Sequence, residues 1–584
     1  MPSHCYWSIC FIHLPTNGVK FFGFAEYLAA VALIALAWTM ADFRYKFRVA
    51  TAPIPLQMTT FVVVAAVGVL TLLTDLWRTE GWLVPEGPFT PGEWQALLGA
   101  AFLFNFIVWI AFAFALPSRF GRLNDERFGF QVYKVILRGI PAELSEAADE
   151  LIRSFERLIR YAWTEPEIDG LPNGSGKTHA DINGLFRTRQ CAHEILLMLG
   201  DKRFCRQVVS SSPPTALVLF DEMERQNKHS VSLGTFAKNI TTEAIANRDS
   251  FAYHETSGYE AGLLGQVKPL TSALYGNYKL VSGLKQVYDV HYEQYGRWDA
   301  AQWKAFSRLL LTTTKNFVAV RGAPGAWYYP PEISRAVDLI QNSANGLPML
   351  NGKPEVAWSS DDFEKLQVAA DFANAFIEAL GPMKGKGYQT LRKHKGKFSA
   401  DVYDIAANLI FHLVFIAASI KTPETLSWYV QHNVVWSTFF DMVDTSEPST
   451  KVVQFKVRRL LYNELKRMDT FPNFKGTRLL GLLLNVMGLS DQAPSNYDRN
   501  SRPLKRATLS WTRKNFARIW EENNRAVGEN ALVDGITYDA DKACLIHTQP
   551  PMLGKEARST VFQVNPYVSP YGTLGTGDNS QPSS

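Results

Sequence analysis

The sequence predicts a mainly α-helical protein in which a three-helix transmembrane segment precedes a large α-helical cytoplasmic domain. Three observations support this fold class. Long apolar stretches are concentrated before residue 117, apolar residues recur at helical spacing from Ala142 onward, and strand patterns are sparse. With 584 residues, of which 47% are hydrophobic, the chain is long enough to bury a large core.

The transmembrane prediction rests on residues 21–41, 58–74 and 96–116. Each stretch has about the length of apolar helix that crosses a hydrocarbon core of about 30 Å. Residues 1–20 lack the basic start and the small-residue cleavage site of a signal peptide, so we expect them to form an extracytoplasmic N-terminal segment.

The charges of the loops predict the orientation. The first loop and the segment after the third stretch are basic, whereas the second loop is mainly acidic. The basic residues are Arg44, Lys46, Arg48, Arg119, Arg122 and Arg127. The positive-inside rule then predicts a multi-pass inner-membrane protein whose N-terminus and second loop face outward and whose main domain is cytoplasmic.

Two polar residues lie within the predicted spans. Glu26 is near the outer end of the first, where we expect its carboxylate to reach headgroup water, although an intramembrane carboxylate can also mark a functional site. Asn105 lies mid-span, where an interhelical hydrogen bond is favoured over a conduit. Pairs of alanines four residues apart offer packing faces, so a homo-oligomer is a further expectation.

The cytoplasmic domain is predicted in three parts, which are helical residues 117–383, basic helical residues 384–566 and a disordered tail at 567–584. The segment AELSEAADELIRSFERLIRYAW places apolar residues three and four apart with charges on the other face. The apolar stretch 404–420 is interpreted as a buried helix. A membrane crossing there would put the basic region that follows it outside, against the charge rule.

The segment GSGKT, residues 174–178, resembles the end of a phosphate-binding loop. Such a loop requires a glycine where this chain has Leu171, and it follows a buried strand that YAWTEPEIDG does not provide. LVLFDE, residues 217–222, could end in carboxylates that hold magnesium, or could belong to a helix that starts near Ser212. The nucleotide-site candidates are Gly176, Lys177, Thr178, Asp221 and Glu222. A loop between helices is the favoured interpretation.

No metal site, cofactor or catalytic residue is predicted. Cys191, His193 and Cys205 are ligand types without the paired spacing of a zinc site. The five cysteines are widely scattered, which argues against a disulfide framework and predicts free thiols in the main body. The sequence therefore favours a non-enzymatic protein.

The charge distribution gives the main cytoplasmic signal. Residues 384–525 contain 23 Lys and Arg against 12 Asp and Glu, an excess of +11. We interpret the cations as candidates for contact with anionic lipid or nucleic acid, and a solvated basic surface is the alternative. These candidates are Lys384, Lys386, Arg392, Lys393, Lys395, Lys397, Arg502, Lys505, Arg506, Arg513, Lys514 and Arg518.

Three functional hypotheses follow. The favoured one is an integral membrane protein that anchors a large helical sensing or interaction domain, with the bilayer and an unidentified protein as partners. The second is a membrane-perturbing effector, such as one of bacterial antiviral defence, and it rests on architecture alone. The third is a membrane-anchored NTPase that uses the GSGKT and LVLFDE segments.

Overall fold

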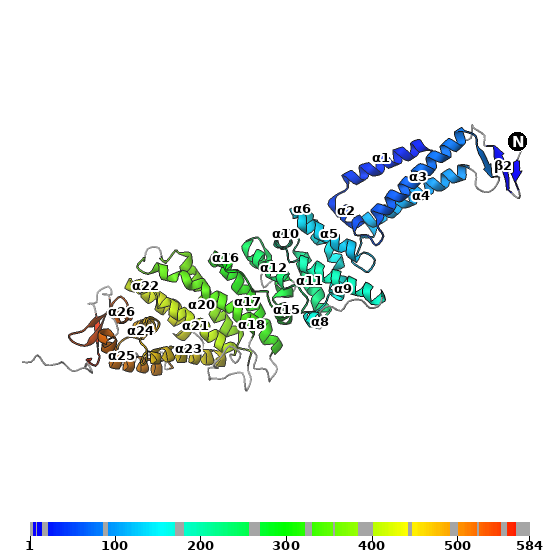
Figure 1. Ribbon diagram of the computed structural model, residues 1–584. Coiled ribbons are helices and arrows are strands. Elements are labelled where there is room, and N and C mark those ends of the chain that lie inside the picture. The colour runs from blue at the N-terminus through cyan, green and yellow to red at the C-terminus, as the bar shows by residue number, and fades with distance from the viewer. Residues whose placement is uncertain are drawn as a thin grey trace, which may run out of the picture. The chain divides into compact units, whose positions relative to one another are not determined.

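The structure is a computed structural model of the 584-residue chain. It describes residues 4–6, 9–13, 22–85, 91–169, 180–255, 269–321, 330–353, 357–383, 401–441, 447–490, 500–522, 525–549 and 558–567. The chain is mainly helical, which confirms the predicted class (Figure 1). It divides into two compact units, Met1–Leu274 with Ser282–Val287, and Tyr275–Val281 with Tyr288–Ser584. The predicted boundaries at residues 116 and 383 do not coincide with this division.

The first unit begins with an apolar helical hairpin. Its elements are α1 (Phe24–Met40), α2 (Phe43–Ala50), α3 (Leu56–Thr79), α4 (Pro91–Ile110) and the π-helical turn η1 (Ala111–Ala115). Helix α3 packs on both α1 and α4. By length and hydropathy, two helices of the described chain could cross a membrane, Leu56–Thr79 and Gly92–Ala115. The three-helix segment is therefore not confirmed, because α1 has only 17 residues.

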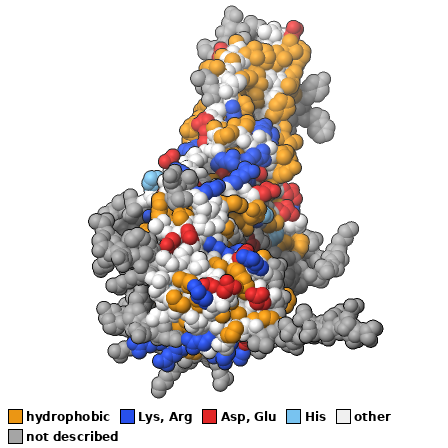
Figure 2. Space-filling view, turned by 90° about the vertical axis from the view of Figure 1, so that its left-hand side faces the viewer, with side chains coloured by type: hydrophobic (Ala, Val, Ile, Leu, Met, Phe, Trp, Pro, Cys, Tyr) orange, Lys and Arg blue, Asp and Glu red, His pale blue; other side chains and the backbone are white. Residues whose placement is uncertain are grey.

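The surface of this hairpin is unusually apolar. Phe61 is 75% exposed and Phe104 is 69% exposed, and hydrophobic side chains cover much of the hairpin in the upper part of Figure 2. Inside, Tyr27 packs on α3, where its hydroxyl donates to the Val64 carbonyl at 2.9 Å. Gly68 permits this approach, since a Cβ there would lie 2.5 Å from the Tyr27 hydroxyl oxygen. Large exposed apolar surfaces of this kind mark membrane or protein contact.

A small antiparallel sheet lies at one end of the hairpin. Strand β2 (Ile9–His13) pairs with β1 (His4–Tyr6) and with β3 (Leu83–Pro85), which follows α3. Cys10 is disulfide-bonded, and Cys5 is the residue opposite it in the β1–β2 register. The three other cysteines, Cys191, Cys205 and Cys544, are free. The expectation of free thiols therefore holds for the main body and fails at the N-terminus.

The opposite end of the hairpin is joined to the next helices by a buried ion pair. Arg48 of α2 donates from Nε and Nη2 to the two carboxylate oxygens of Glu150, at 2.8 and 2.6 Å, and from Nη1 to the Ala113 carbonyl at 3.1 Å. Both side chains are buried. Arg44 adds contacts to Asp149 and Glu150. The first-loop arginines thus contact protein, and Arg48 is removed from solvent.

The remaining elements of the first unit are helical. They are α5 (Asp125–Arg138), α6 (Pro141–Leu151), η2 (Ile152–Ser154), α7 (Phe155–Tyr161), α8 (Glu165–Asp169), α9 (Ala180–Met198), α10 (Lys202–Ser211), α11 (Pro213–Arg225), α12 (Gly234–Ala246), α13 (Phe251–His254) and α14 (Leu270–Leu274). The spacing predicted for residues 142–163 is confirmed, since Leu144, Leu151, Phe155 and Leu158 are buried.

The second unit surrounds one apolar helix. Its helices after the boundary helix α15 (Tyr278–Leu284) are α16 (Tyr292–Tyr295), α17 (Ala300–Arg321), α18 (Pro331–Ser343), η4 (Ala344–Leu350), α20 (Asp361–Ala379), α21 (Val402–Ala417), α22 (Glu424–Trp428), η5 (Tyr429–Asp441), α23 (Pro448–Arg467), α24 (Phe474–Met487), α25 (Arg502–Glu522) and α26 (Arg525–Glu529). Helix α21 packs on α18, α20, α23 and α24, and its apolar side chains are buried. The buried-helix interpretation of 404–420 is confirmed.

The chain closes with strands that the sequence analysis did not predict. Strands β4 (Ile536–Asp539), β5 (Cys544–Gln549) and β6 (Arg558–Gln563) form an antiparallel sheet. Leu545 and Phe562 face each other across β5 and β6, and both are buried. Strands this short leave little periodic signal, so their pairing rather than a local pattern defines them.

Candidate polyanion-binding site

Helix α23 separates buried from exposed residues by its helical period. Val453, Val457 and Leu461 are buried on one face, and α23 packs on both α21 and α24. The exposed face presents cations and aromatic rings in alternation. It carries Lys451, Phe455, Arg459, Tyr462 and Lys466, at successive spacings of four, four, three and four residues. Residues at these spacings share one side of a helix.

Helix α25 lies beside α23 and is also basic on its outer face. Its buried side includes Leu504 and Phe516, whereas Arg502, Arg506 and Arg513 are exposed. The Trp511 indole donates to Asp469 Oδ1 at 2.6 Å, so α25 is tied to the segment that directly follows α23. This contact holds the two basic helices side by side.

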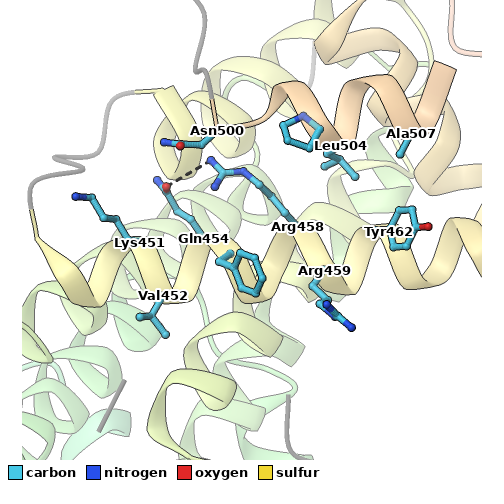
Figure 3. A pocket seen from close by; sticks show the side chains of 11 residues that line it. Lys451, Val452, Gln454, Arg458, Arg459, Tyr462, Asn500, Leu504 and Ala507 are labelled. Carbon is cyan, nitrogen blue, oxygen red and sulfur yellow. Dashed lines mark hydrogen bonds between the residues drawn. The ribbon is translucent and has the colours of Figure 1, made fainter. Parts of the chain in front are cut away.

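A groove of about 530 Å³ separates the two helices (Figure 3). Among the described residues, its lining contains three cations and no carboxylate. The lining residues are Lys451, Val452, Gln454, Phe455, Arg458, Arg459, Tyr462, Asn500, Pro503, Leu504 and Ala507. Arg502 and Arg506 of α25 flank this lining in the sequence and are exposed. A concave surface of one charge sign raises the local concentration of opposite charge, so the groove attracts anions.

Arg458 is the fixed cation of the groove. Its Nε donates to Ser501 Oγ at 3.2 Å and its Nη2 to Gln454 Oε1 at 3.4 Å, as Figure 3 shows for the second bond. Its guanidinium carbon lies 5.2 Å from the centre of the Phe440 ring. These contacts hold the guanidinium of Arg458 in place beside the groove.

Lys456, on the same helix, has the opposite role. Its ammonium lies 2.9 Å from Asp401 Oδ1 and 2.8 Å from Asp404 Oδ1, and its side chain is buried. Burial, followed by the neighbouring Asp404 charge, raises the pKa of Asp401. Lys456 is therefore neutralised inside the fold, and the cations that a ligand can reach are those of the exposed face.

The twelve cations predicted from the sequence are only partly placed. Lys384, Lys386, Arg392, Lys393, Lys395 and Lys397 lie outside the described residues. The other six lie on α25, where Lys505 and Arg518 are half-buried and Arg502, Arg506, Arg513 and Lys514 are exposed. The Arg513 guanidinium stacks over the Phe562 ring at 5.0 Å.

The sequence analysis missed the contribution of α23. Lys451, Arg458 and Arg459 were counted in the charge excess without being assigned to a site, and Phe455 and Tyr462 were not considered. The alternation of cation and ring along one helical face was the signal that could have identified them.

The nucleotide candidates gain no support from the fold. Gly176, Lys177 and Thr178 lie outside the described residues. Asp221 and Glu222 lie on helix α11, not at the end of a strand. Glu222 accepts two bonds from Arg225, at 2.9 and 2.7 Å. This carboxylate is therefore paired within its own helix, and the sheet that supports a phosphate-binding loop is not found in the described part of 171–222.

The other candidates have structural partners. Glu26 accepts from the Gly23 backbone N–H at 2.9 Å and so caps its own helix. Thr60 Oγ1 lies 3.4 Å from Asn105 Oδ1, between α3 and α4. Burial, followed by nearby carboxylates, raises the pKa of the Cys191 thiol to about 11. Among the described residues, no group of three or more His, Cys, Asp or Glu side chains could hold a metal ion.

The chain was also compared with known proteins. No protein-family model matches it, and neither the curated proteins nor the solved structures gave a match.

Proposed function

We propose that this is a multi-pass integral protein of the inner membrane that anchors a large helical cytoplasmic interaction domain, whose ligand is a polyanion. The groove between α23 and α25 supports the polyanion part of the proposal, because the described residues of its lining include three cations and no carboxylate. The first half is supported by the exposed apolar surface of α3 and α4. An unidentified protein partner and a homo-oligomer remain part of the proposal.

We further propose that α1 is the third span. Seventeen helical residues extend about 26 Å, close to the hydrocarbon thickness. Helix α1 also runs alongside the two longer helices from end to end. At its start, the Phe24 backbone N–H donates to Asp75 Oδ2 at 2.9 Å, and near its other end the Trp38 and Trp109 rings lie 5.9 Å apart.

The disulfide supports the proposed orientation. Disulfides persist in oxidising compartments and are rare in the cytosol. Cys10 lies in the sheet that also contains β3, in the second loop of the hairpin. The disulfide and the acidic second loop therefore both favour an outer location for this end of the hairpin. The basic first loop favours an inner location for the other end.

Fusions of a topology reporter test this arrangement. A reporter placed after Arg138 is expected to be cytoplasmic, and one inserted between Glu86 and Glu93 is expected to be external. In intact cells, a membrane-impermeant maleimide should label Cys10 only after an impermeant reductant is added. External labelling of Cys191 or an external Arg138 fusion would overturn the orientation.

Binding to polyanions tests the interaction domain. Full-length protein in a neutral detergent should bind heparin, anionic vesicles or oligonucleotides, and salt should weaken the binding because the attraction is electrostatic. Replacing both Arg459 and Arg506 by Glu should weaken it at least about tenfold. The matched control replaces Lys304 and Lys315 of α17 by Glu, because both lysines are exposed, lie outside the groove lining and give the same change of net charge. Equal losses in both proteins would show that net charge, not the groove, governs binding.

A further inference from the structure

The groove between α23 and α25 has a second property besides its charge. Two aromatic side chains, Phe455 and Tyr462, line it and are 40% and 43% exposed. Both belong to α23 and are seven residues apart, so about 10.5 Å of helix axis separates them. Large rings left this exposed beside cations have no evident role in the core of the unit.

The rings alternate with charges along the helix. Lys451 precedes Phe455 by one turn, Arg459 lies between the two rings, and Lys466 follows Tyr462 by one turn. Arg458 adds a charge on the side toward α25, where the wall is formed by Pro503, Leu504 and Ala507. A ligand lying along α23 would therefore meet cation, ring, cation, ring and cation in sequence.

We propose that this groove binds single-stranded nucleic acid, with two bases stacked on Phe455 and Tyr462 and the backbone phosphates against Lys451 and Arg459 of the groove and against Lys466, one turn beyond it on the same face of α23. Proteins that bind single strands without sequence preference combine a positively charged groove with aromatic rings for the bases. The inference deepens the proposed function and rests on it, since it names the polyanion.

Two other polyanions fit the groove less well. A lipid headgroup offers charge but no planar ring, so it leaves the exposed aromatic side chains without partners. A nucleic-acid duplex keeps its base faces stacked inside, so it too could use only the cations. The interleaved rings are the observation that favours bases in a single strand.

The test uses full-length protein in neutral detergent and a fluorescent oligothymidine of about 12 nucleotides, within the site sizes known for such proteins. An abasic oligonucleotide of equal length and charge is the matched ligand. The wild type is expected to bind oligothymidine more tightly than the abasic strand. Phe455→Leu and Tyr462→Leu should each weaken oligothymidine binding about 5- to 150-fold, the contribution of one stacked base.

Conservative variants separate stacking from folding. Phe455→Trp and Tyr462→Phe keep a ring and should retain oligothymidine binding. Leucine variants should leave abasic-strand binding unchanged, because their charges are intact. Tyr292→Ala, which removes a 73%-exposed ring from α16, is the control for an aromatic residue outside the groove lining.

The possible results separate a failure of single-strand binding from a failure of polyanion binding in general. If anionic vesicles or heparin bind through Arg459 while the leucine variants bind oligothymidine as the wild type does, the polyanion function stands and the single-strand inference is wrong. If none of these polyanions binds, both are wrong. Preferential binding of vesicles over oligothymidine would assign the groove to lipid headgroups.

Discussion

Arg48 in the first unit and Arg459 in the second are the same residue type in two different environments. Arg48 lies at the base of the hairpin, where it is buried and forms a two-bond contact with Glu150. Its partner raises the pKa of its guanidinium, against the opposing effect of burial. Arg459 is exposed and lines the groove, whose described lining residues include no carboxylate. One charge is committed to the fold, whereas the other is available to a ligand.

The difference follows from what surrounds each charge. A buried charge requires a partner of opposite sign and further hydrogen bonds, and Glu150 and the Ala113 carbonyl supply them. An exposed cation stays hydrated and contributes little to stability. Replacing Arg48 should therefore change the stability of the fold, whereas replacing Arg459 of α23 should change the affinity for a ligand.

The largest expected effect is at the buried pair. Arg48→Met removes both strong bonds to the buried Glu150 carboxylate and leaves only the partly exposed Arg44 beside it, which should destabilise the protein by about 3–5 kcal/mol. Thermal or denaturant unfolding in detergent measures the loss. The double variant Arg48→Met with Glu150→Met should recover most of it, because replacing both partners removes the uncompensated charge. A stable single variant would mean that water reaches the pair.

A smaller effect, on binding and not on stability, is expected at the groove. The three exposed cations proposed to contact phosphates, Lys451, Arg459 and Lys466, predict that log K for a single strand falls with log salt concentration with a slope of about −2. Arg459→Ala should make the slope less steep by about 0.7 and change stability by less than about 0.5 kcal/mol. If a folded Arg48 variant changed the salt dependence of binding, the distinction between a structural Arg48 and a ligand-binding Arg459 would be wrong.

The sequence could predict whatever depends on local period. Apolar spacing located α3, α4, α7 and α21, and the burial of 404–420 followed from the charge of its neighbours. The length of a helix was harder to predict. The apolar stretch 21–41 begins before the first helical residue of α1, which is Phe24. The N-terminal sheet depends on pairing between distant segments, such as Phe11 with Pro85, which no local pattern shows.

The site was predictable only as a charge excess. Composition indicated that residues 384–525 are basic, but it could not show that Lys456 is neutralised by Asp401 and Asp404 while Arg459 is exposed. The same limit applies to Asp221 and Glu222. Their sequence is compatible with the end of a strand or with a helix, and in the structure they lie on a helix. Placement of charges relative to a surface is a tertiary property.

The smallest expected effect on stability concerns an exposed carboxylate. It is hydrogen-bonded within the fold, as Arg48 is, but it is exposed to solvent, as Arg459 is. Glu167 accepts from the Thr164 backbone N–H at 2.8 Å, from the Thr164 hydroxyl at 3.0 Å and from Arg189 Nη2 at 2.8 Å. The Thr164 backbone bond is the main cause that lowers the pKa of Glu167 to about 2, and the bond from Arg189 adds to it. Its side chain is 46% exposed, so solvent weakens the contact.

Because the pKa of Glu167 is lower in the folded protein than its ordinary value of 4.5, the ionised form stabilises the fold. That stabilisation is complete above pH 4.5 and is lost as the pH falls from about 4.5 to about 2. Glu167→Gln should therefore cost up to about 1 kcal/mol near neutral pH and nothing below about pH 2. Unfolding of both proteins across this range measures the difference. A difference that persists in acid would assign the effect to lost packing, and one larger than the Arg48→Met effect would contradict the rule that exposure limits what a charge contributes to the fold.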